Sequence, residues 1–166
     1  MSSRIAKSLT LAALTAVLAA CSSVPLDQTG TTTGGAGADG ASTGQVMDPF
    51  NPQSPLAQQR SVYFEFDSYT IPEQYRGLVE MHSSYLRSNT QQRVRVEGHA
   101  DARGGSEYNL ALGQRRSEAV SRMMGLLGVN AGQVEAISFG KERPRATGNT
   151  EADYAENRRA DIVYQQ

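Results

Sequence analysis

Residues 93–128 read RVRVEGHADARGGSEYNLALGQRRSEAVSRMMGLLG, and within them a strand pattern is followed by a loop and then by a helix pattern. Val94 and Val96 alternate with charged residues, so every second side chain can face a core. This alternation predicts a strand that runs to about His99. A loop that contains two consecutive glycines should follow the strand.

The helix after this loop should begin near Ser106, which can cap its first turn, and should end near Leu127, just before Gly128. One side of the helix can face a core, with Tyr108, Leu112, Ala119, Met123 and Leu127. The charged side can face water, with Arg115, Glu118 and Arg122. The pattern therefore predicts one long amphipathic helix.

A second amphipathic helix should open at Pro72, because proline suits the first turn of a helix. Its apolar stripe recurs at steps of three and four residues, with Tyr75, Leu78, Val79, His82, Tyr85 and Leu86. His82 lies on this stripe. We therefore expect a half-buried, hydrogen-bonded histidine rather than a metal ligand.

Three more strands and a short helix complete the predicted order, with strands at 62–66, 134–139 and 159–164 and a helix that Thr150 caps and that runs to Asn157. Two apolar helix stripes need a sheet face to cover, so the economical fold is an α/β (α+β) two-layer sandwich. Short crossovers favour parallel neighbours, whereas the late strands can pair antiparallel. We therefore expect a mixed four-stranded sheet covered by helices.

The first twenty residues have the pattern of a signal peptide. Arg4 and Lys7 precede Leu9–Ala20, which contains no charged residue. As a helix this run would span about 18 Å, which is too short for a membrane core of about 30 Å. Residues 1–20 are therefore expected to direct export and to be removed.

The sequence Leu18-Ala19-Ala20-Cys21 resembles a lipobox, in which the cysteine receives lipid. Cys21 is the only cysteine, so no internal disulfide can form. The alternative of a free or packed thiol is disfavoured, because the small neighbouring residues offer nothing to pack against. Two or more acyl chains would anchor the protein stably. Ser22 after the cysteine is typical of lipoproteins that are sent to the outer membrane.

Residues 21–59 are predicted to be a lipidated N-terminus and flexible tether. Residues 29–44 are small or polar throughout, and the three prolines that follow stand in a stretch without helical or strand periodicity. The folded domain is therefore expected at residues 60–166.

Charge and residue inventory argue against several classes of function. The formal net charge is −1, so the chain lacks the basic excess that nucleic-acid binding needs. If the strand continues, Glu97, His99 and Asp101 share one face, which leaves a metal site or a hydrolase of the cell wall as an alternative. Such residues lie about 7 Å apart and converge poorly on one ion. No serine nucleophile pattern is apparent, so we expect no enzyme, no metal and no cofactor.

Four separated motifs point to a family. They are YFEFD at 63–67, GHADARG at 98–104, EYNLALGQRR at 107–116 and NRR at 157–159. In this order they resemble the peptidoglycan-binding domain of the outer-membrane protein A (OmpA) family, and the resemblance covers residues 60–166. Ala100 and Gly113 stand where many relatives have threonine and serine, and neither departure removes a charged group.

The resemblance implies a ligand and the residues that bind it. Domains of this family recognise the diaminopimelate residue of the peptidoglycan stem, which carries an ammonium and a carboxylate on one carbon. Asp101 would accept from the ammonium, and Arg116 would donate two hydrogen bonds to the carboxylate. The alternative is a salt bridge between Asp101 and Arg116 that ties the loop to the helix. Under the ligand hypothesis, alanine at either position should abolish most binding at little cost in stability.

Further residues receive supporting roles from the resemblance. Asn109 would help to hold the ligand. Phe66 and Asp67 would lie beside the pocket, and backbone groups of Asp67 and Arg103 would complete the ligand's hydrogen bonds. Ordinary sheet packing is the alternative for Phe66. The two arginines of the last motif are expected to support the fold or a partner surface.

Partners and a location also follow from the resemblance. Lipoproteins of this family are anchored in the outer membrane, face the periplasm and link the membrane to the cell wall, together with TolB and other Tol proteins. TolB would dock around Phe66, Glu107 and Tyr108, because aromatic rings beside an acidic residue suit an interface, where aromatic anchors commonly dominate the binding energy. TolB and peptidoglycan would then compete. The alternatives are that Tyr108 only packs under the loop and that the chain anchors another envelope complex.

Overall fold

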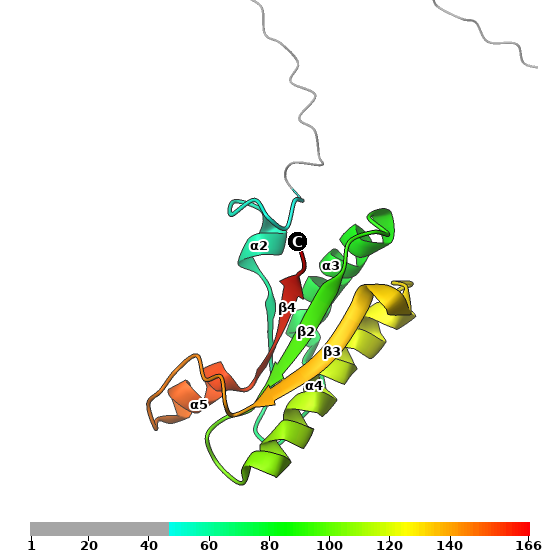
Figure 1. Cartoon of the computed structure of the whole chain (residues 1–166). Coiled ribbons are helices and arrows are strands. Elements are labelled where there is room, and N and C mark those ends of the chain that lie inside the picture. The colour runs from blue at the N-terminus through cyan, green and yellow to red at the C-terminus, as the bar shows by residue number, and fades with distance from the viewer. Residues whose placement is uncertain (1–46) are drawn as a thin grey trace, which may run out of the picture. The chain divides into compact units, whose positions relative to one another are not determined.

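The computed structural model describes residues 47–166 (Figure 1). The signal peptide predicted for residues 1–20, the lipidation of Cys21 and most of the tether lie outside the described residues. Within the described part of the chain, no helix has both the length and the apolar character needed to cross a membrane.

A mixed four-stranded sheet forms one layer, in the order β1-β4-β2-β3 (Figure 1). Its strands are β1 (Ser61–Tyr63), β2 (Val94–His99), β3 (Val134–Gly140) and β4 (Arg159–Tyr164). Strand β4 runs antiparallel to both of its neighbours, with Ala160 opposite Val62 and Ile162 opposite Val96. Strands β2 and β3 are parallel. The prediction of a mixed sheet is confirmed.

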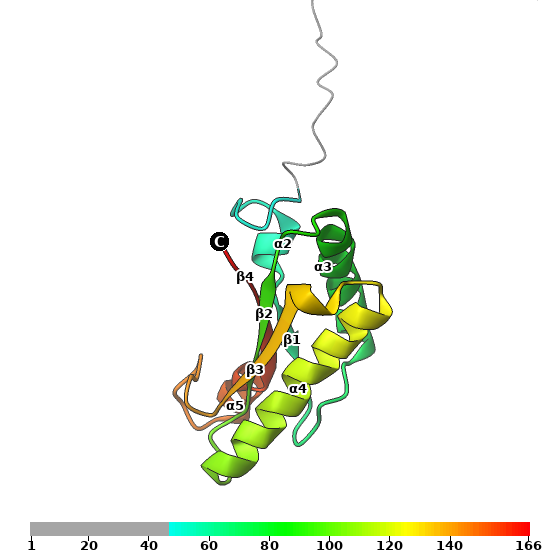
Figure 2. The same cartoon turned by 45° about the vertical axis from the view of Figure 1, so that its right-hand side comes forward.

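The second layer consists of two long helices that cover one face of the sheet (Figure 2). The long helices are α3 (Arg76–Ser88) and α4 (Ser106–Leu126). The described residues also form the short helices α2 (Pro55–Gln58) and α5 (Glu151–Asn157) and the 3-10 turns η1 (Glu73–Tyr75) and η2 (Ala131–Gln133). Apolar side chains of α3, α4 and the sheet form one core, with Val62, Phe64, Val79, Leu86, Val94, Val96, Val120, Met124, Val129, Ala160, Ile162 and Tyr164. The predicted two-layer sandwich is therefore present.

The buried side of α4 differs from the predicted one. Tyr108 is 53 % exposed, and Met123 and Leu127 are only partly buried. The residues of α4 that are buried are Asn109, Leu112, Gly113, Arg116, Ser117, Val120 and Met124. The reason is a contact between backbones: α4 crosses β2 where Gly98 faces Gly113, and this contact sets the rotation of the helix.

Strand β1 is shorter than predicted. It ends at Tyr63 rather than at residue 66. The amide of Phe64 still donates to the carbonyl oxygen of Arg158 at 2.8 Å, and the chain then leaves the sheet. The next helix begins one turn later than predicted, because Pro72 is followed by η1.

Of the three residues predicted to cap or stop a helix, two do so in the structure. Gly128 follows α4 with a φ of 90°, which suits a helix stop. Thr150 caps α5 in a capping box with Asp153. Ser106 is the first residue of α4 rather than its cap, because Gly105 occupies the cap position without a side-chain hydrogen bond.

Residues just before β1 pack on the domain, although the sequence pattern assigned them to the tether. Pro49 and Leu56 are buried. The guanidinium of Arg60 donates to the carbonyl oxygens of Pro49 and Leu56, and it lies 5.7 Å from the ring centroid of Tyr164. The packed structure therefore begins before residue 60.

His82 is fully buried in the core and hydrogen-bonded on both ring nitrogens. Its Nε2 lies 2.7 Å from the carbonyl oxygen of Gln59, and its Nδ1 lies 2.8 Å from the hydroxyl oxygen of Tyr164. A carbonyl oxygen only accepts, so Nε2 donates to Gln59 and Nδ1 accepts from Tyr164. Burial lowers the pKa of His82 to about 4, so the ring is neutral at pH 7.

This histidine should make the stability depend on pH. The unfolded chain, in which the pKa is 6.5, binds more protons than the folded chain between pH 6.5 and about 4. Stability is therefore fully present above pH 6.5 and is lost as the pH falls toward 4. We expect a loss of about 2 kcal/mol from His82 between pH 7 and pH 5.

Urea titrations of wild type and His82→Gln at both pH values would measure this dependence. Glutamine keeps hydrogen-bonding groups at the site but cannot take up a proton in this range. The fall in unfolding free energy should be about 2 kcal/mol smaller in the variant. An equal fall in both proteins would contradict the assignment to His82.

Candidate functional site

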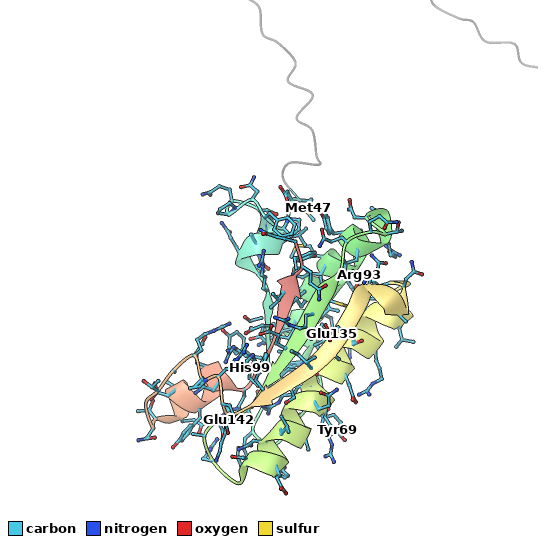
Figure 3. All side chains as sticks on the ribbon, viewed as in Figure 1. Met47, Tyr69, Arg93, His99, Glu135 and Glu142 are labelled. Atoms are coloured by element: carbon cyan, nitrogen blue, oxygen red, sulfur yellow. The ribbon has the colours of Figure 1, made fainter. Side chains whose placement is uncertain are left out.

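A pocket of about 270 Å³ lies where β2 ends and β4 begins. It is lined by Phe66, Asp67, Asp101, Arg103, Gly104, Tyr108, Asn109, Leu112, Arg116 and Arg158. Figure 3 shows Tyr69, from the loop after β1, and Glu142, from the loop after β3, at the end of the domain away from Met47. All six residues predicted to bind the ligand line this pocket, although they come from three separate segments.

Asp101 provides a buried negative charge at the pocket. Its side chain is 6 % exposed. The Oδ2 atom accepts from Nη2 of Arg103 at 2.6 Å and lies 3.5 Å from Nη1 of Arg158, while Oδ1 accepts from the amide of Arg103 at 3.1 Å. Burial by itself would raise the pKa of Asp101, but the hydrogen bonds from Arg103 outweigh it and the pKa falls below its ordinary value. Asp101 is therefore ionised at neutral pH.

Arg116 provides a positive charge that is completely buried. Its Nε donates to the carbonyl oxygen of Ser68 at 2.8 Å. Its Nη1 donates to that of His99 at 2.8 Å, and its Nη2 to that of Glu65 at 3.2 Å. Burial lowers the pKa of Arg116 to about 10, so the side chain stays protonated at pH 7. A guanidinium has more N–H donors than these three bonds use.

The alternative of a salt bridge between Asp101 and Arg116 is wrong. Among residues 47–166, Asp101 forms its ion pairs with Arg103 and Arg158. Arg116 instead holds three backbone carbonyl groups, which come from the loop after β1 and from the end of β2. Because of these three hydrogen bonds, we now expect Arg116→Ala to cost stability as well as binding.

The side chain of Arg103 is a feature of the pocket that the sequence did not reveal, because only its backbone was expected to contribute. Its guanidinium carbon lies 4.5 Å from the ring centroid of Phe66 and 4.3 Å from that of Tyr154. Its Nη1 also lies 3.3 Å from Oε2 of Glu151, at the start of α5. The signal available in the sequence was the acidic first turn of that short helix.

Arg158 was expected to support the fold or a partner surface, and it does support the pocket wall. It is buried, its Nε donates to the carbonyl oxygen of Phe64 at 3.1 Å, and its Nη1 donates to Glu151 at 2.8 Å. It therefore fixes the loop after β1 against α5.

Asn109 and Tyr108 hold the loops that surround the pocket. The Nδ2 of Asn109 donates to the carbonyl oxygen of Arg103 at 2.7 Å. The hydroxyl of Tyr108 donates to Oδ1 of Asp67, whose backbone has a φ of 52°. Aspartate tolerates this left-handed conformation better than most residues. Tyr108 thus contacts a loop and is also half exposed.

Gly98 and Gly113 position the two charges, a role that the sequence motifs did not suggest. A Cβ on Gly98 would lie 1.8 Å from the carbonyl oxygen of Gly113. The absent side chains allow α4 to lie directly on β2, which brings Arg116 close to the loop that carries Asp101. A glycine inside a predicted strand is a known sign of close backbone approach and could have revealed this.

The three residues of the alternative metal or hydrolase site do not come together. Glu97 accepts from Arg95 at 2.8 Å. Nε2 of His99 lies 3.6 Å from Oδ2 of Asp161, and the His99 ring stacks on that of Phe139. Asp101 lies in the pocket. Among residues 47–166, no group of three histidine, cysteine or carboxylate side chains is placed to hold a metal ion.

Comparison with known proteins assigns the sequence to a family. The OmpA family matches residues 63–158, which is more than half of the chain. The chain belongs to the OmpA family. The peptidoglycan-associated lipoprotein of Pasteurella multocida is 38 % identical over 161 residues, which cover 97 % of this chain and 99 % of that relative. The peptidoglycan-associated lipoprotein of Pseudomonas aeruginosa is 42 % identical over 158 residues and 92 % of each chain.

Solved structures confirm the OmpA-like fold. The peptidoglycan-associated lipoprotein from Burkholderia pseudomallei has 56 % sequence identity and a TM-score of 0.68, over 70 % of this chain and 98 % of that chain. The C-terminal domain of Helicobacter pylori MotB has a TM-score of 0.59 at 20 % identity, over 64 % of this chain and 84 % of that chain. The likeness to MotB concerns the fold alone.

Proposed function

We propose that this chain is an outer-membrane lipoprotein that binds peptidoglycan without covalent chemistry, through the diaminopimelate residue of the stem peptide. The observation that carries this proposal is the placing of Asp101 and Arg116 on one pocket of about 270 Å³. The similarity to peptidoglycan-associated lipoproteins along nearly the whole chain supports it.

The chemistry of the pocket suits a small zwitterion. Diaminopimelate carries an ammonium and a carboxylate on the same carbon, so it needs an acceptor and a donor that are held close together. Asp101 is the acceptor, and the guanidinium of Arg116 is the donor. Both charges are held by neighbouring groups before the ligand arrives, which lowers the entropic cost of binding.

The test of this function is the replacement of Asp101 by asparagine in the full-length chain, followed by a pull-down with purified sacculi. Asparagine keeps the shape and an oxygen acceptor but loses the negative charge. We expect binding to weaken about tenfold to a hundredfold, as for the loss of one charge-assisted hydrogen bond. Glu135→Gln is the control, because it removes a negative charge from an exposed residue on the edge strand β3.

Melting curves of both variants separate a loss of binding from a loss of fold. The asparagine variant also loses its ion pairs with Arg103 and Arg158, so binding is compared at a temperature at which all proteins are folded. Full-strength binding by Asp101→Asn would refute the proposed site.

In this proposal, Cys21 carries the lipid that anchors the chain in the outer membrane, and the residues after it form the tether. The protein then links the membrane to the cell wall as part of the Tol-Pal system, which serves envelope integrity and cell division. Acyl label on wild type but not on Cys21→Ser would test the anchor.

The proposed protein partner is TolB, docked over Phe66, Glu107 and Tyr108. Phe66 is 62 % exposed and Tyr108 is 53 % exposed, and both also line the pocket. A partner that covers these rings would close the pocket to stem peptide. The two ligands should therefore compete for the domain.

Titration of TolB into the full-length chain with bound, labelled stem peptide should release the label. Glu107→Arg changes an exposed residue that does not line the pocket, so it should weaken release by TolB while it leaves peptide affinity unchanged. Unchanged peptide binding at saturating TolB would show that the two sites are independent.

A further inference from the structure

Arg103 occupies the pocket in an unusual way. Its guanidinium lies between the rings of Phe66 and Tyr154 and donates to Asp101 at 2.6 Å. Its Nε is buried and has no hydrogen-bond partner among residues 47–166. The side chain as a whole is 38 % exposed. It is therefore held by a short ion pair with Asp101, a longer one with Glu151 and the two rings, not by a complete set of hydrogen bonds.

We propose that Arg103 is a displaceable internal cation, which the ammonium group of an incoming ligand replaces at Asp101. This inference rests on the proposed function, because it requires a ligand ammonium at that carboxylate. Without a ligand, Arg103 neutralises Asp101. On binding, the guanidinium moves away and keeps Glu151 as its partner.

Crowding at the carboxylate is the reason for the exchange. Oδ1 of Asp101 accepts the amide of Arg103, and Oδ2 accepts Nη2 of Arg103 with Arg158 at 3.5 Å. Arg103 is the closer cation at Oδ2, so an ammonium that takes this position replaces Arg103. Arg158 is 7 % exposed and is fixed by Phe64 and Glu151, whereas the side chain of Arg103 is 38 % exposed. Arg103 is therefore the group that moves.

Glu151 makes the exchange possible at low cost. Its carboxylate lies 3.3 Å from Nη1 of Arg103 and is 65 % exposed. When Arg103 leaves Asp101, its charge is still paired. The rings of Phe66 and Tyr154 can also follow a guanidinium over a short distance, because a cation over an aromatic face needs no single geometry.

The exchange concerns only ligands that carry an ammonium group. A ligand with a carboxylate but no ammonium cannot replace Arg103. Asp101 then stays paired with Arg103 and makes no favourable contact with such a ligand. A ligand that carries both charges exchanges one cation for another. Arg103 therefore lowers the affinity for every ligand ammonium.

The experiment measures binding of meso-diaminopimelate and of pimelate, the same carbon chain without amino groups, to the full-length chain purified in detergent. Arg103→Gln removes the internal cation. It should bind meso-diaminopimelate about fivefold more tightly than wild type, the size of one partly exposed ion pair. Pimelate should show no gain. Arg87→Gln, an exposed arginine in the last turn of α3, is the matched control.

Two further variants show whether the effect passes through the proposed partners. In Asp101→Asn, the added Arg103→Gln change should give no gain. Glu151→Gln takes away the second partner of Arg103 and also a partner of Arg158, so it should weaken binding of meso-diaminopimelate about twofold or more. This second variant also tests the exchange if Arg103→Gln melts early.

The outcomes separate this inference from the function on which it rests. Wild type that binds meso-diaminopimelate, combined with an Arg103→Gln variant that binds it equally or more weakly, overturns the internal cation alone. Wild type that binds neither meso-diaminopimelate nor sacculi overturns the proposed function, and the inference with it.

Discussion

Replacement of Gly98 by alanine should lower the unfolding free energy by about 3 kcal/mol or more, although it adds a single methyl group. The added Cβ would lie 1.8 Å from the carbonyl oxygen of Gly113, and backbone cannot rotate away as a side chain can. Helix α4 must therefore move off β2. The movement would also separate Arg116 from the loop that carries Asp101, so sacculus binding should fall with stability.

Denaturant titration measures the loss, with Gly125→Ala as the control. Gly125 lies in the same helix and is exposed, and a methyl group there would meet no neighbouring side chain or strand within 4 Å. Alanine there should stabilise the protein by about 0.5 to 1 kcal/mol. A loss below about 1 kcal/mol in Gly98→Ala would mean that the contact between α4 and β2 is not rigid.

Arg116→Ala is expected to cost about 3 kcal/mol of stability as well as most sacculus binding. The carbonyl groups of Ser68 and His99 would lose this donor, whereas that of Glu65 would keep the amide of Ser68 at 3.2 Å. Each buried carbonyl without a partner costs about 1 to 3 kcal/mol, and water that enters the vacated space recovers part of the sum. The loops on both sides of the pocket would lose their common support.

Arg115→Ala is the matched control for this prediction, because Arg115 is the exposed neighbour of Arg116 on α4. Its unfolding free energy should stay within about 0.5 kcal/mol of wild type. Arg116→Ala is assayed for binding only below its own transition. A variant that melts like wild type but has lost sacculus binding would make Arg116 a pure ligand group and would contradict its supporting role.

Sequence alone determined the strands, the two long helices and α5, with their order, because these depend on local patterns. The alternation around Val94 and Val96 predicted β2, and the apolar stripe through Val79 and Leu86 predicted α3. Thr150 marked the start of α5 through a cap that involves only its own first turn. Periods of two and 3.6 residues, like caps, need no knowledge of distant segments.

Family resemblance named, by motif, six of the residues that line the pocket, but it did not find what each side chain does there. Asp101 and Arg116 line one pocket without pairing with each other. The position of Arg103 between Phe66 and Tyr154 depends on α5, which lies far along the chain. A motif preserves residue types at fixed spacing and contains no information on such contacts.

Only the tertiary structure decided the rotation of α4 and the burial of Arg116. An apolar stripe predicts that apolar side chains turn inward, and on that basis Tyr108 was expected inside and Arg116 was not. The backbone contact between Gly98 and Gly113 decides the rotation of α4 instead. Any other rotation would bring a residue with a Cβ against the backbone of β2, where there is no room for a side chain. The buried guanidinium is tolerated because three carbonyl groups from separate segments surround it, and folding alone brings them together.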